Sequence, residues 1–228
     1  YLEKGKVLEK EKKYTEAIEN YKITLALEDP TSFALLRIGY CYEKLGEDDL
    51  AVQFFNRTVE EDPLLDKGWI AITKFFNKKR NYQKALHYIK KAVNIDGDNV
   101  LYWKLYAKIN LRLNFLEEAA EGFKRTLELG NYELETWIER TDILIKLGEY
   151  NAAIYNLLQA IEFYPESEEI EYRLGGLYFK LMQTDKGRYH LKNALRINNE
   201  YDFIIDELFP NLKNRPIVKE IILSAKKS

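Results

Sequence analysis

Residues 69–103 read WIAITKFFNKKRNYQKALHYIKKAVNIDGDNVLYW, and this stretch contains the pattern that decides the fold. Its first half places three apolar side chains on one face of a helix: Trp69, Ile72 and Phe76. After a break at Arg80 and Asn81, a second helical face follows: Ala85, Ile89 and Ala92. The stretch therefore predicts a helical hairpin, with a first helix, a short turn and a second helix.

This hairpin pattern recurs with a period of 34 residues. The tryptophans of the chain have that spacing: Trp69, Trp103 and Trp137, with Leu35 and Tyr1 at the earlier positions. Small residues recur with it in the second helix: Ala17, Ala51, Ala85, Ala119, Ala153 and Gly187. Large apolar residues follow four positions later: Tyr21, Phe55, Ile89, Phe123, Leu157 and Leu191. Independent series with one period predict six stacked hairpins.

The residue types in these series explain why hairpins should stack. Small side chains such as Ala51 and Ala85 let the two helices of a hairpin approach closely, and larger ones such as Trp103 and Phe123 fill the space between helices. Burying one such large side chain contributes roughly 1.5–3 kcal/mol. Because a single hairpin cannot bury its own apolar face, neighbouring hairpins must form a continuous core. The expected fold class is all-α.

The order of Trp, Leu-Gly, Tyr, Ala, Phe, Ala and Pro over 34 residues resembles the tetratricopeptide repeat (TPR) family. The second repeat carries it most fully: Leu35, Ile38, Gly39, Tyr42, Gly46, Ala51, Phe55 and Pro63. Middle repeats depart from it, with Thr73, Ala107 and Thr141 in place of the glycine. The resemblance implies a right-handed superhelical solenoid with repeats at about 1–30, 31–65, 66–99, 100–133, 134–167 and 168–199.

Residues 200–228 are expected to form a cap over the last repeat. Residues 203–209 predict a short helix that Pro210 ends, and Pro216 begins a second helix that runs to Lys226 and Lys227. Basic residues suit the C-terminal end of a helix. An apolar pair of helices at this place would cover the exposed face of the solenoid.

Composition excludes several classes of function. The net charge of −2 gives no global reason to bind nucleic acid or a membrane, and the single cysteine, Cys41, excludes a disulfide framework. His87 and His190 are far apart and expected to face outward, so no metal centre is expected. No phosphate-binding loop, nucleophile elbow or zinc-protease motif occurs. We therefore expect no enzyme activity, no cofactor and no small-molecule ligand.

The register of the family places the first helix of each repeat along the groove where partners bind. In repeats two to four these positions are mostly basic: Arg37, Lys44, Lys67, Lys74, Lys78, Lys104, Lys108 and Arg112, with Tyr40 as an apolar neighbour. Like charges at this spacing repel one another by a few tenths of a kcal/mol per pair, and nothing in the fold requires them. The sequence thus predicts a groove for an acidic partner segment or a C-terminal carboxylate. The alternative is a solvated lysine-rich face.

The leading functional hypothesis is a non-catalytic scaffold that binds a protein or peptide. An RNA-binding helical repeat is one alternative, and an accessory domain of a larger protein with an upstream catalytic or signalling segment is another. Self-association through the first repeat is a further one. Because the chain begins at Tyr1, within an expected helix, its native N-terminus is expected to lie upstream. A bacterial source and a cytoplasmic location are favoured.

Overall fold

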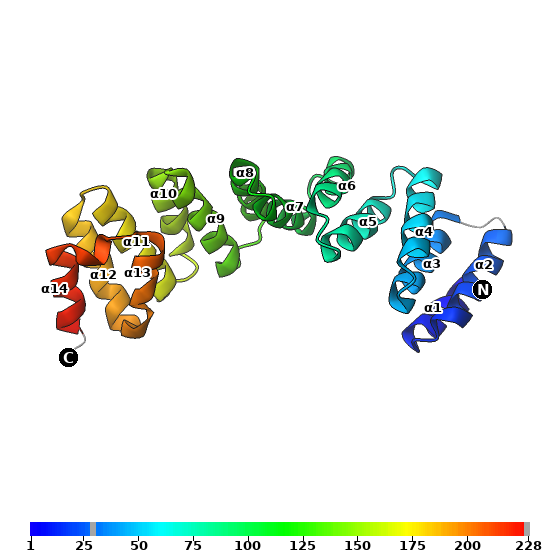
Figure 1. The fold of residues 1–228 in the computed structure, drawn as a ribbon, viewed down its shortest axis with the longest axis horizontal. Helices are drawn as coiled ribbons and strands as arrows, with labels where there is room; N and C mark the ends of the chain where they lie inside the picture. Colours follow the sequence, from blue (N-terminus) through cyan, green and yellow to red (C-terminus); the bar gives the residue numbers. More distant parts are fainter. Residues whose placement is uncertain (28–30, 226–228) are drawn as a thin grey trace. The chain divides into compact units, whose positions relative to one another are not determined.

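The computed structural model describes residues 1–27 and 31–225, which form fourteen α-helices and two short 3₁₀ helices without a strand (Figure 1). This confirms the all-α prediction. The chain divides into two compact units, Tyr1–Phe115 and Leu116–Ser228, which we call the N-terminal and C-terminal units. Lys226 and Lys227, at the predicted end of the last helix, lie outside the described residues.

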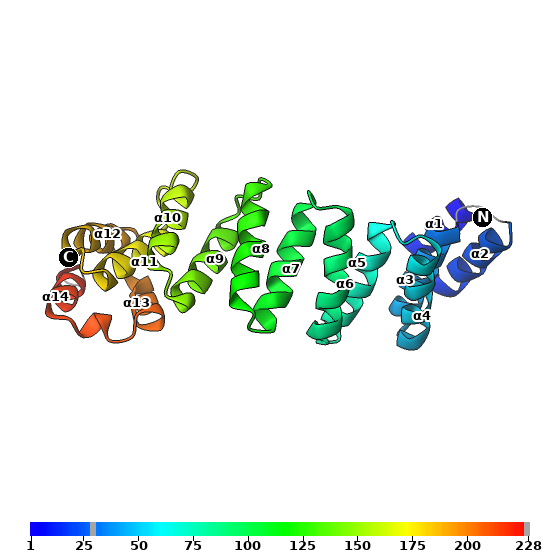
Figure 2. The same ribbon diagram turned by 90° about the horizontal axis from the view of Figure 1, so that it is seen from above.

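The N-terminal unit is a row of seven helices in which each helix packs on the next (Figure 2). They are α1 (Leu2–Lys10), α2 (Tyr14–Ala26), α3 (Thr31–Leu45), α4 (Asp48–Glu61), α5 (Asp66–Lys78), α6 (Tyr82–Ile95) and α7 (Val100–Arg112). The predicted small and large positions are buried as expected, since Ala51, Phe55, Ala85 and Ile89 have no exposed surface. Trp69 and Trp103 are only half-buried, so they lie at the edge of this core.

The C-terminal unit contains α8 (Leu116–Glu128), α9 (Leu134–Leu147), α10 (Tyr150–Ala160), α11 (Glu168–Lys180), α12 (Thr184–Ile197), α13 (Phe203–Leu208) and α14 (Pro216–Ala225). The 3₁₀ helices span Asn199–Asp202 and Leu212–Asn214. The helix predicted to end before Pro210 is α13, and the helix predicted to begin at Pro216 is α14. Within this unit α13 packs on α11 and α14 packs on α12.

The turns between the helices of a hairpin share one backbone feature. Six residues spaced 34 apart have a positive φ, of which only two are glycines: Lys12, Gly46, Arg80, Asn114, Gly148 and Met182. After each of them, a backbone N–H donates to the carbonyl five residues earlier, as Asn81 does to Phe76 (2.9 Å) and Glu149 to Leu144 (2.9 Å). This is the hydrogen bond of a Schellman helix end. The division into six repeats stays a prediction. The positive-φ residues nevertheless recur every 34 residues, which is the period on which that prediction is based.

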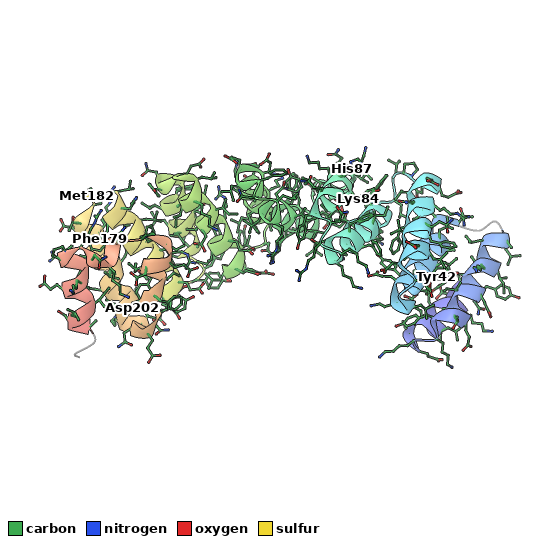
Figure 3. The ribbon with its side chains drawn as sticks, in the orientation of Figure 1. Tyr42, Lys84, His87, Phe179, Met182 and Asp202 are labelled. Carbon is green, nitrogen blue, oxygen red and sulfur yellow. The ribbon has the colours of Figure 1, made fainter. Side chains whose placement is uncertain are left out.

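One sequence expectation about the last repeat is wrong. His190 was expected to face outward, whereas its side chain is mostly buried, with Nδ1 2.7 Å from Glu171 Oε2 and the ring stacked on Tyr178. Glu171 occupies the place that tryptophan holds in the middle repeats, and it is buried. A buried carboxylate needs a polar partner, and the imidazole on α12 supplies it. His87, in contrast, is exposed on α6 (Figure 3).

Candidate partner-binding groove

The nine residues predicted to line the groove all lie on three helices of the N-terminal unit. Helix α3 carries Arg37, Tyr40 and Lys44, α5 carries Lys67, Lys74 and Lys78, and α7 carries Lys104, Lys108 and Arg112. The structure brings only three of them, from two helices, into one cleft. This α5–α7 cleft has a volume of about 290 Å³ and is lined by Ile70, Lys74, Leu101, Tyr102, Lys104, Leu105 and Lys108.

Helical spacing accounts for the arrangement of this cleft. On α5, Ile70 and Lys74 are one turn apart, and on α7 the pairs Leu101–Leu105 and Lys104–Lys108 have the same separation. The start of α7 is set by Asn99, whose Oδ1 accepts a hydrogen bond from the backbone N–H of Leu101 (3.2 Å). Two helices thus present lysines beside apolar side chains.

A buried tyrosine ties the two helices together beneath the cleft. The Tyr102 hydroxyl on α7 donates a hydrogen bond to the Asp66 carboxylate at the start of α5. Burial raises the pKa of Tyr102, and the hydrogen bond to Asp66 raises it further. The phenol therefore stays protonated and remains a donor, so the floor of the cleft is held by a persistent link.

The apolar part of the cleft is unusually accessible on one side. Leu101 is 71% exposed, although it lies directly beside buried Tyr102 and opposite buried Ile70. A largely exposed leucine beside cationic groups gives a bound segment both an apolar contact and a charged one. Leu101, Tyr102 and Leu105 were not singled out from the sequence, because an apolar residue on a helix reads equally well as core.

Arg37 and Lys78, both predicted to line the groove, form ion pairs between helices. Arg37 contacts Glu9 through Nη2 (2.5 Å) and Nε (2.9 Å), and the Tyr21 hydroxyl donates to the same carboxylate (3.0 Å). Lys78 contacts Glu43 at 3.0 Å. Both charges are therefore compensated within the fold, and a role for them in partner binding stays a prediction.

The remaining predicted residues do not join the cleft. Tyr40 is half-buried and meets the ring of Phe55 edge-on with 5.2 Å between centroids, so it contributes to the core. Lys44, Lys67 and Arg112 are exposed and do not line the α5–α7 cleft. Their role in binding stays a prediction.

The described residues were also compared with what a metal site, a membrane-spanning helix and a reactive thiol require. Residues 1–27 and 31–225 contain no cluster of three or more side chains that could hold a metal ion. Within the same ranges, no helix has the length and apolarity needed to cross a bilayer. Cys41 is fully buried, and desolvation raises its pKa to about 12, so the thiol is a poor nucleophile at neutral pH.

Two segments of the chain match protein-family models. Residues 33–64 match the model described as tetratricopeptide repeat, and residues 142–181 match one described as TPR repeat. The first segment contains most of α3 and all of α4, and the second contains the C-terminal end of α9 and all of α10 and α11. One match lies in each compact unit.

Several curated proteins are similar in sequence. The photosystem I assembly protein Ycf3 of Cuscuta gronovii is 29% identical over 147 residues, covering 62% of this chain and 76% of that protein. The human protein O-mannosyl-transferase TMTC1 is 24% identical over 169 residues, covering 72% of this chain and 19% of that protein. The tetratricopeptide repeat-containing protein trd-1 of Caenorhabditis elegans is 24% identical over 162 residues. The chain spans about a fifth of the length of the last two.

Solved structures share the fold at low sequence identity. YrrB, described as a TPR protein with an unusual peptide-binding site, superimposes with a TM-score of 0.66 at 16% identity, covering 92% of this chain and all of that one. MamA gives 0.61 at 16% identity over 78% of this chain and 95% of its own. PilF of Pseudomonas aeruginosa gives 0.58 at 14% identity over 98% and 96%.

Proposed function

Because this chain is a tetratricopeptide-repeat protein, a class that generally mediates protein–protein interactions, we propose that it is a non-catalytic scaffold whose α5–α7 cleft binds an acidic segment of a partner protein. The observation that carries the proposal is the composition of this cleft. Three lysines from two helices border an apolar surface formed by Ile70, Leu101 and Leu105. Such a surface suits a segment that carries an apolar side chain between carboxylates.

The apolar side chain of the partner would provide most of the affinity. Burying apolar surface contributes about 25 cal/mol per Å², and Leu101 offers an accessible surface without a change in the fold. The segment would lie across α5 and α7, where Tyr102 and Asp66 already hold the two helices in place. A preorganised surface of this kind loses little entropy on binding.

The lysines would provide selectivity and speed. Positive charge on the cleft attracts acidic segments before contact, which raises the association rate, and salt screens the attraction. A cation on a long side chain can also follow a carboxylate over a range of positions. Binding is thus expected to weaken as salt concentration rises, mainly through a slower association rate.

The test compares two variants that remove the same charge. The groove variant carries Lys74→Gln, Lys104→Gln and Lys108→Gln, and the control carries Lys22→Gln, Lys90→Gln and Lys91→Gln at exposed positions of α2 and α6. Each chain is used to capture proteins from the lysate of its source organism, and captured proteins are then titrated individually against all three chains by calorimetry. Circular dichroism checks that each variant is folded.

The proposal expects a partner that the wild type and the control bind equally and that the groove variant loses. A partner bound equally by all three chains would overturn the role of the cleft. Salt-sensitive binding of single-stranded RNA that the groove variant loses, without any protein partner, would replace the scaffold by an RNA-binding function. Turnover of a captured molecule by the isolated chain would overturn the non-catalytic assignment.

A further inference from the structure

A second cleft, in the C-terminal unit, has a different chemical character. This α8–α10 cleft has a volume of about 340 Å³ and lies between α8 and α10, with α9 also contributing to its walls. Its lining residues are Lys124, Leu127, Glu128, Tyr132, Trp137, Arg140, Tyr155 and Gln159. The volume is near the lower end of the range of ligand pockets. It is large enough for a single side chain of a bound peptide.

Trp137 brings a buried hydrogen-bond donor to this cleft. The side chain is 4% exposed, and its Nε1 atom meets no acceptor among the described residues. The tryptophans at the same register in the N-terminal unit are satisfied, since Trp69 donates to the Pro63 carbonyl (2.9 Å) and Trp103 to the Gly97 carbonyl (2.7 Å). A buried donor without an acceptor destabilises the fold, and an incoming acceptor would remove that cost.

The connection before α9 differs from the connections before α5 and α7. Helices α4 and α6 are followed by connections that span residues 62–65 and 96–99, whereas the connection from α8 to α9 spans residues 129–133 and is one residue longer. No residue is inserted, since Trp103 and Trp137 are 34 apart; α8 instead ends one residue earlier in its repeat than α6 does, and Gly130 after it has φ 95°. Tyr132 of this connection stacks on the face of the Trp137 ring, with centroids 6.4 Å apart, and no carbonyl among the described residues accepts from the indole Nε1 atom.

Arg140 brings a second donor, and its place in the repeat is unusual. The equivalent residues are Tyr106 one repeat earlier, Ile72 two repeats earlier and Leu174 one repeat later. Ile72 and Leu174 are fully buried, so a guanidinium occupies a position that otherwise holds an apolar core residue. Its Nε atom is buried without a partner among residues 1–27 and 31–225.

A buried polar network holds this guanidinium in one orientation. Arg140 Nη1 donates to Asn156 Oδ1 (2.6 Å), and Asn156 Nδ2 donates to the Trp137 carbonyl (2.9 Å) and to Thr141 Oγ1 (2.8 Å). Asn156 and Thr141 are fully buried. The network joins the Arg140 side chain to the backbone carbonyl of Trp137, so the guanidinium is held beside the residue that carries the indole before any ligand arrives.

The charge of Arg140 is not paired within the described fold. Glu128, the acidic residue that lines the cleft, forms an ion pair with Arg125 (Oε2 to Nη1, 3.1 Å), and its Oε1 atom lies 3.9 Å from Lys124 Nζ. No ion pair joins Arg140 to a carboxylate in the described ranges. Desolvation lowers the pKa of Arg140 despite the opposing effect of Glu121, Glu128 and Glu149. A bound anion would compensate the desolvated charge.

We propose that the α8–α10 cleft binds the side-chain carboxylate of a glutamate in a partner peptide, with Arg140 and the Trp137 indole N–H as its two donors. A carboxylate accepts strong hydrogen bonds from a guanidinium and can also accept one from an indole N–H. Since both donor atoms are buried, the carboxylate must be carried on a side chain long enough to reach them from the surface. Exposed Tyr155 and Gln159 at the edge of the cleft would contact the peptide that carries it.

The experiment follows the indole N–H signals of isotope-labelled protein by NMR. The probe is the tripeptide Ala-Glu-Ala, acetylated and amidated so that its side chain holds the only carboxylate. The expected result is a saturable shift of the Trp137 Nε1–H signal, while those of Trp69 and Trp103 stay in place because they already have acceptors. The Trp137→Phe variant assigns the signal, and the matching Ala-Gln-Ala peptide should leave it unchanged.

A variant of Arg140 tests the second donor without destroying the fold. Arg140→Leu is expected to fold, since Leu174 and Ile72 occupy the equivalent positions. It should bind the Ala-Glu-Ala peptide at least tenfold more weakly than the wild type, so that the Trp137 signal no longer shifts at the same peptide concentration. The matched control, Lys146→Leu, removes one charge from an exposed site on the same helix and should bind like the wild type.

Three outcomes would overturn the inference. One is an equal shift with the Glu and Gln peptides, another is unchanged binding by Arg140→Leu, and the third is no shift at saturating probe concentrations. A shift caused by Ala-Gln-Ala with a free C-terminus, but not by the amidated Glu peptide, would assign the site to chain ends and also overturn it. None of these outcomes bears on the α5–α7 cleft, which lies in the other unit.

Discussion

Gly39 on α3 lies directly against the ring of Phe55 on α4, so close that a Cβ atom at Gly39 would fall 2.5 Å from Phe55 Cδ1. Gly5 has the same relationship to Tyr21, one repeat earlier. In both hairpins the absence of a side chain on the first helix makes room for a large ring on the second. The close approach of the two helices in each of these hairpins therefore depends on pairing a glycine on the first helix with a large ring on the second.

Substituting Gly39 by Ala should destabilise the protein. The ring of Phe55 has no exposed surface and cannot move away freely, so we expect a loss of about 1–3 kcal/mol in the free energy of unfolding. Urea unfolding followed by circular dichroism measures it. Gly39→Ala combined with Phe55→Leu should recover most of the loss, because the third and fifth repeats pair Thr73 with Ile89 and Thr141 with Leu157. A double variant less stable than Gly39→Ala would contradict the steric explanation.

Arg80→Gly should stabilise the turn between α5 and α6. Arg80 has φ 57°, and a left-handed conformation costs a non-glycine residue roughly 1–2 kcal/mol. Part of this gain is lost because glycine is more flexible in the unfolded chain, so the net increase in unfolding free energy should be about 0.5–1 kcal/mol. Thermal unfolding measures the shift.

The neighbouring position provides the contrast for that turn. Asn81 Oδ1 accepts from the backbone N–H of Lys84 (3.2 Å) and caps α6, so Asn81→Ala should cost about 1 kcal/mol. If Arg80→Gly lowered stability while Asn81→Ala raised it, the assigned turn geometry would be wrong.

The Arg37–Glu9 pair should contribute to stability more than to binding. Arg37→Met leaves Glu9, whose side chain is 16% exposed, with only the Tyr21 hydroxyl as a partner. We expect a loss of roughly 1.5–3 kcal/mol, toward the lower end because Arg37 itself is partly exposed. Lys44→Met, at an exposed site on the same helix, should change stability by less than about 0.5 kcal/mol. Chemical unfolding measures both, and equal effects would contradict the structural role of Arg37.

Cys41 should resist alkylation until the protein unfolds. Burial raises its pKa to about 12, so the folded state holds the thiol proton more tightly than the unfolded chain, whose cysteine titrates at about 8.5. The stability from this difference is present below the unfolded pKa and is lost as pH rises through the folded pKa. At about pH 8 an unfolded cysteine is partly thiolate, whereas Cys41 is not.

The measurement for Cys41 is the rate of iodoacetamide labelling by mass spectrometry, with and without denaturant. Gln53→Cys in a Cys41→Ala background places a thiol at an exposed position of α4 and should label quickly in the folded protein. Equal labelling rates for the two folded chains would show that Cys41 is accessible.

Much of the fold could be predicted because it is encoded in local patterns. The buried positions Ala51 and Phe55 follow from a period of 34 residues combined with helical spacing. The start of α14 at Pro216 follows from the backbone of proline, which suits the first turn of a helix. The left-handed turns at Lys12, Arg80 and Met182 had no such signal, since none of these residue types favours a positive φ.

The sequence by itself determined the class of fold, the hairpin pattern and the helices that carry the basic residues, because these depend on spacing along one chain. Only the tertiary structure decided which charges are compensated, joining Arg37 to Glu9, Lys78 to Glu43 and Arg173 to Asp142 across different helices. It also left Trp137 Nε1 and Arg140 Nε without acceptors in the described fold. The physical reason is distance: an ion pair or a hydrogen bond forms only when two side chains meet within about 3–4 Å, and a repeat period does not specify that separation.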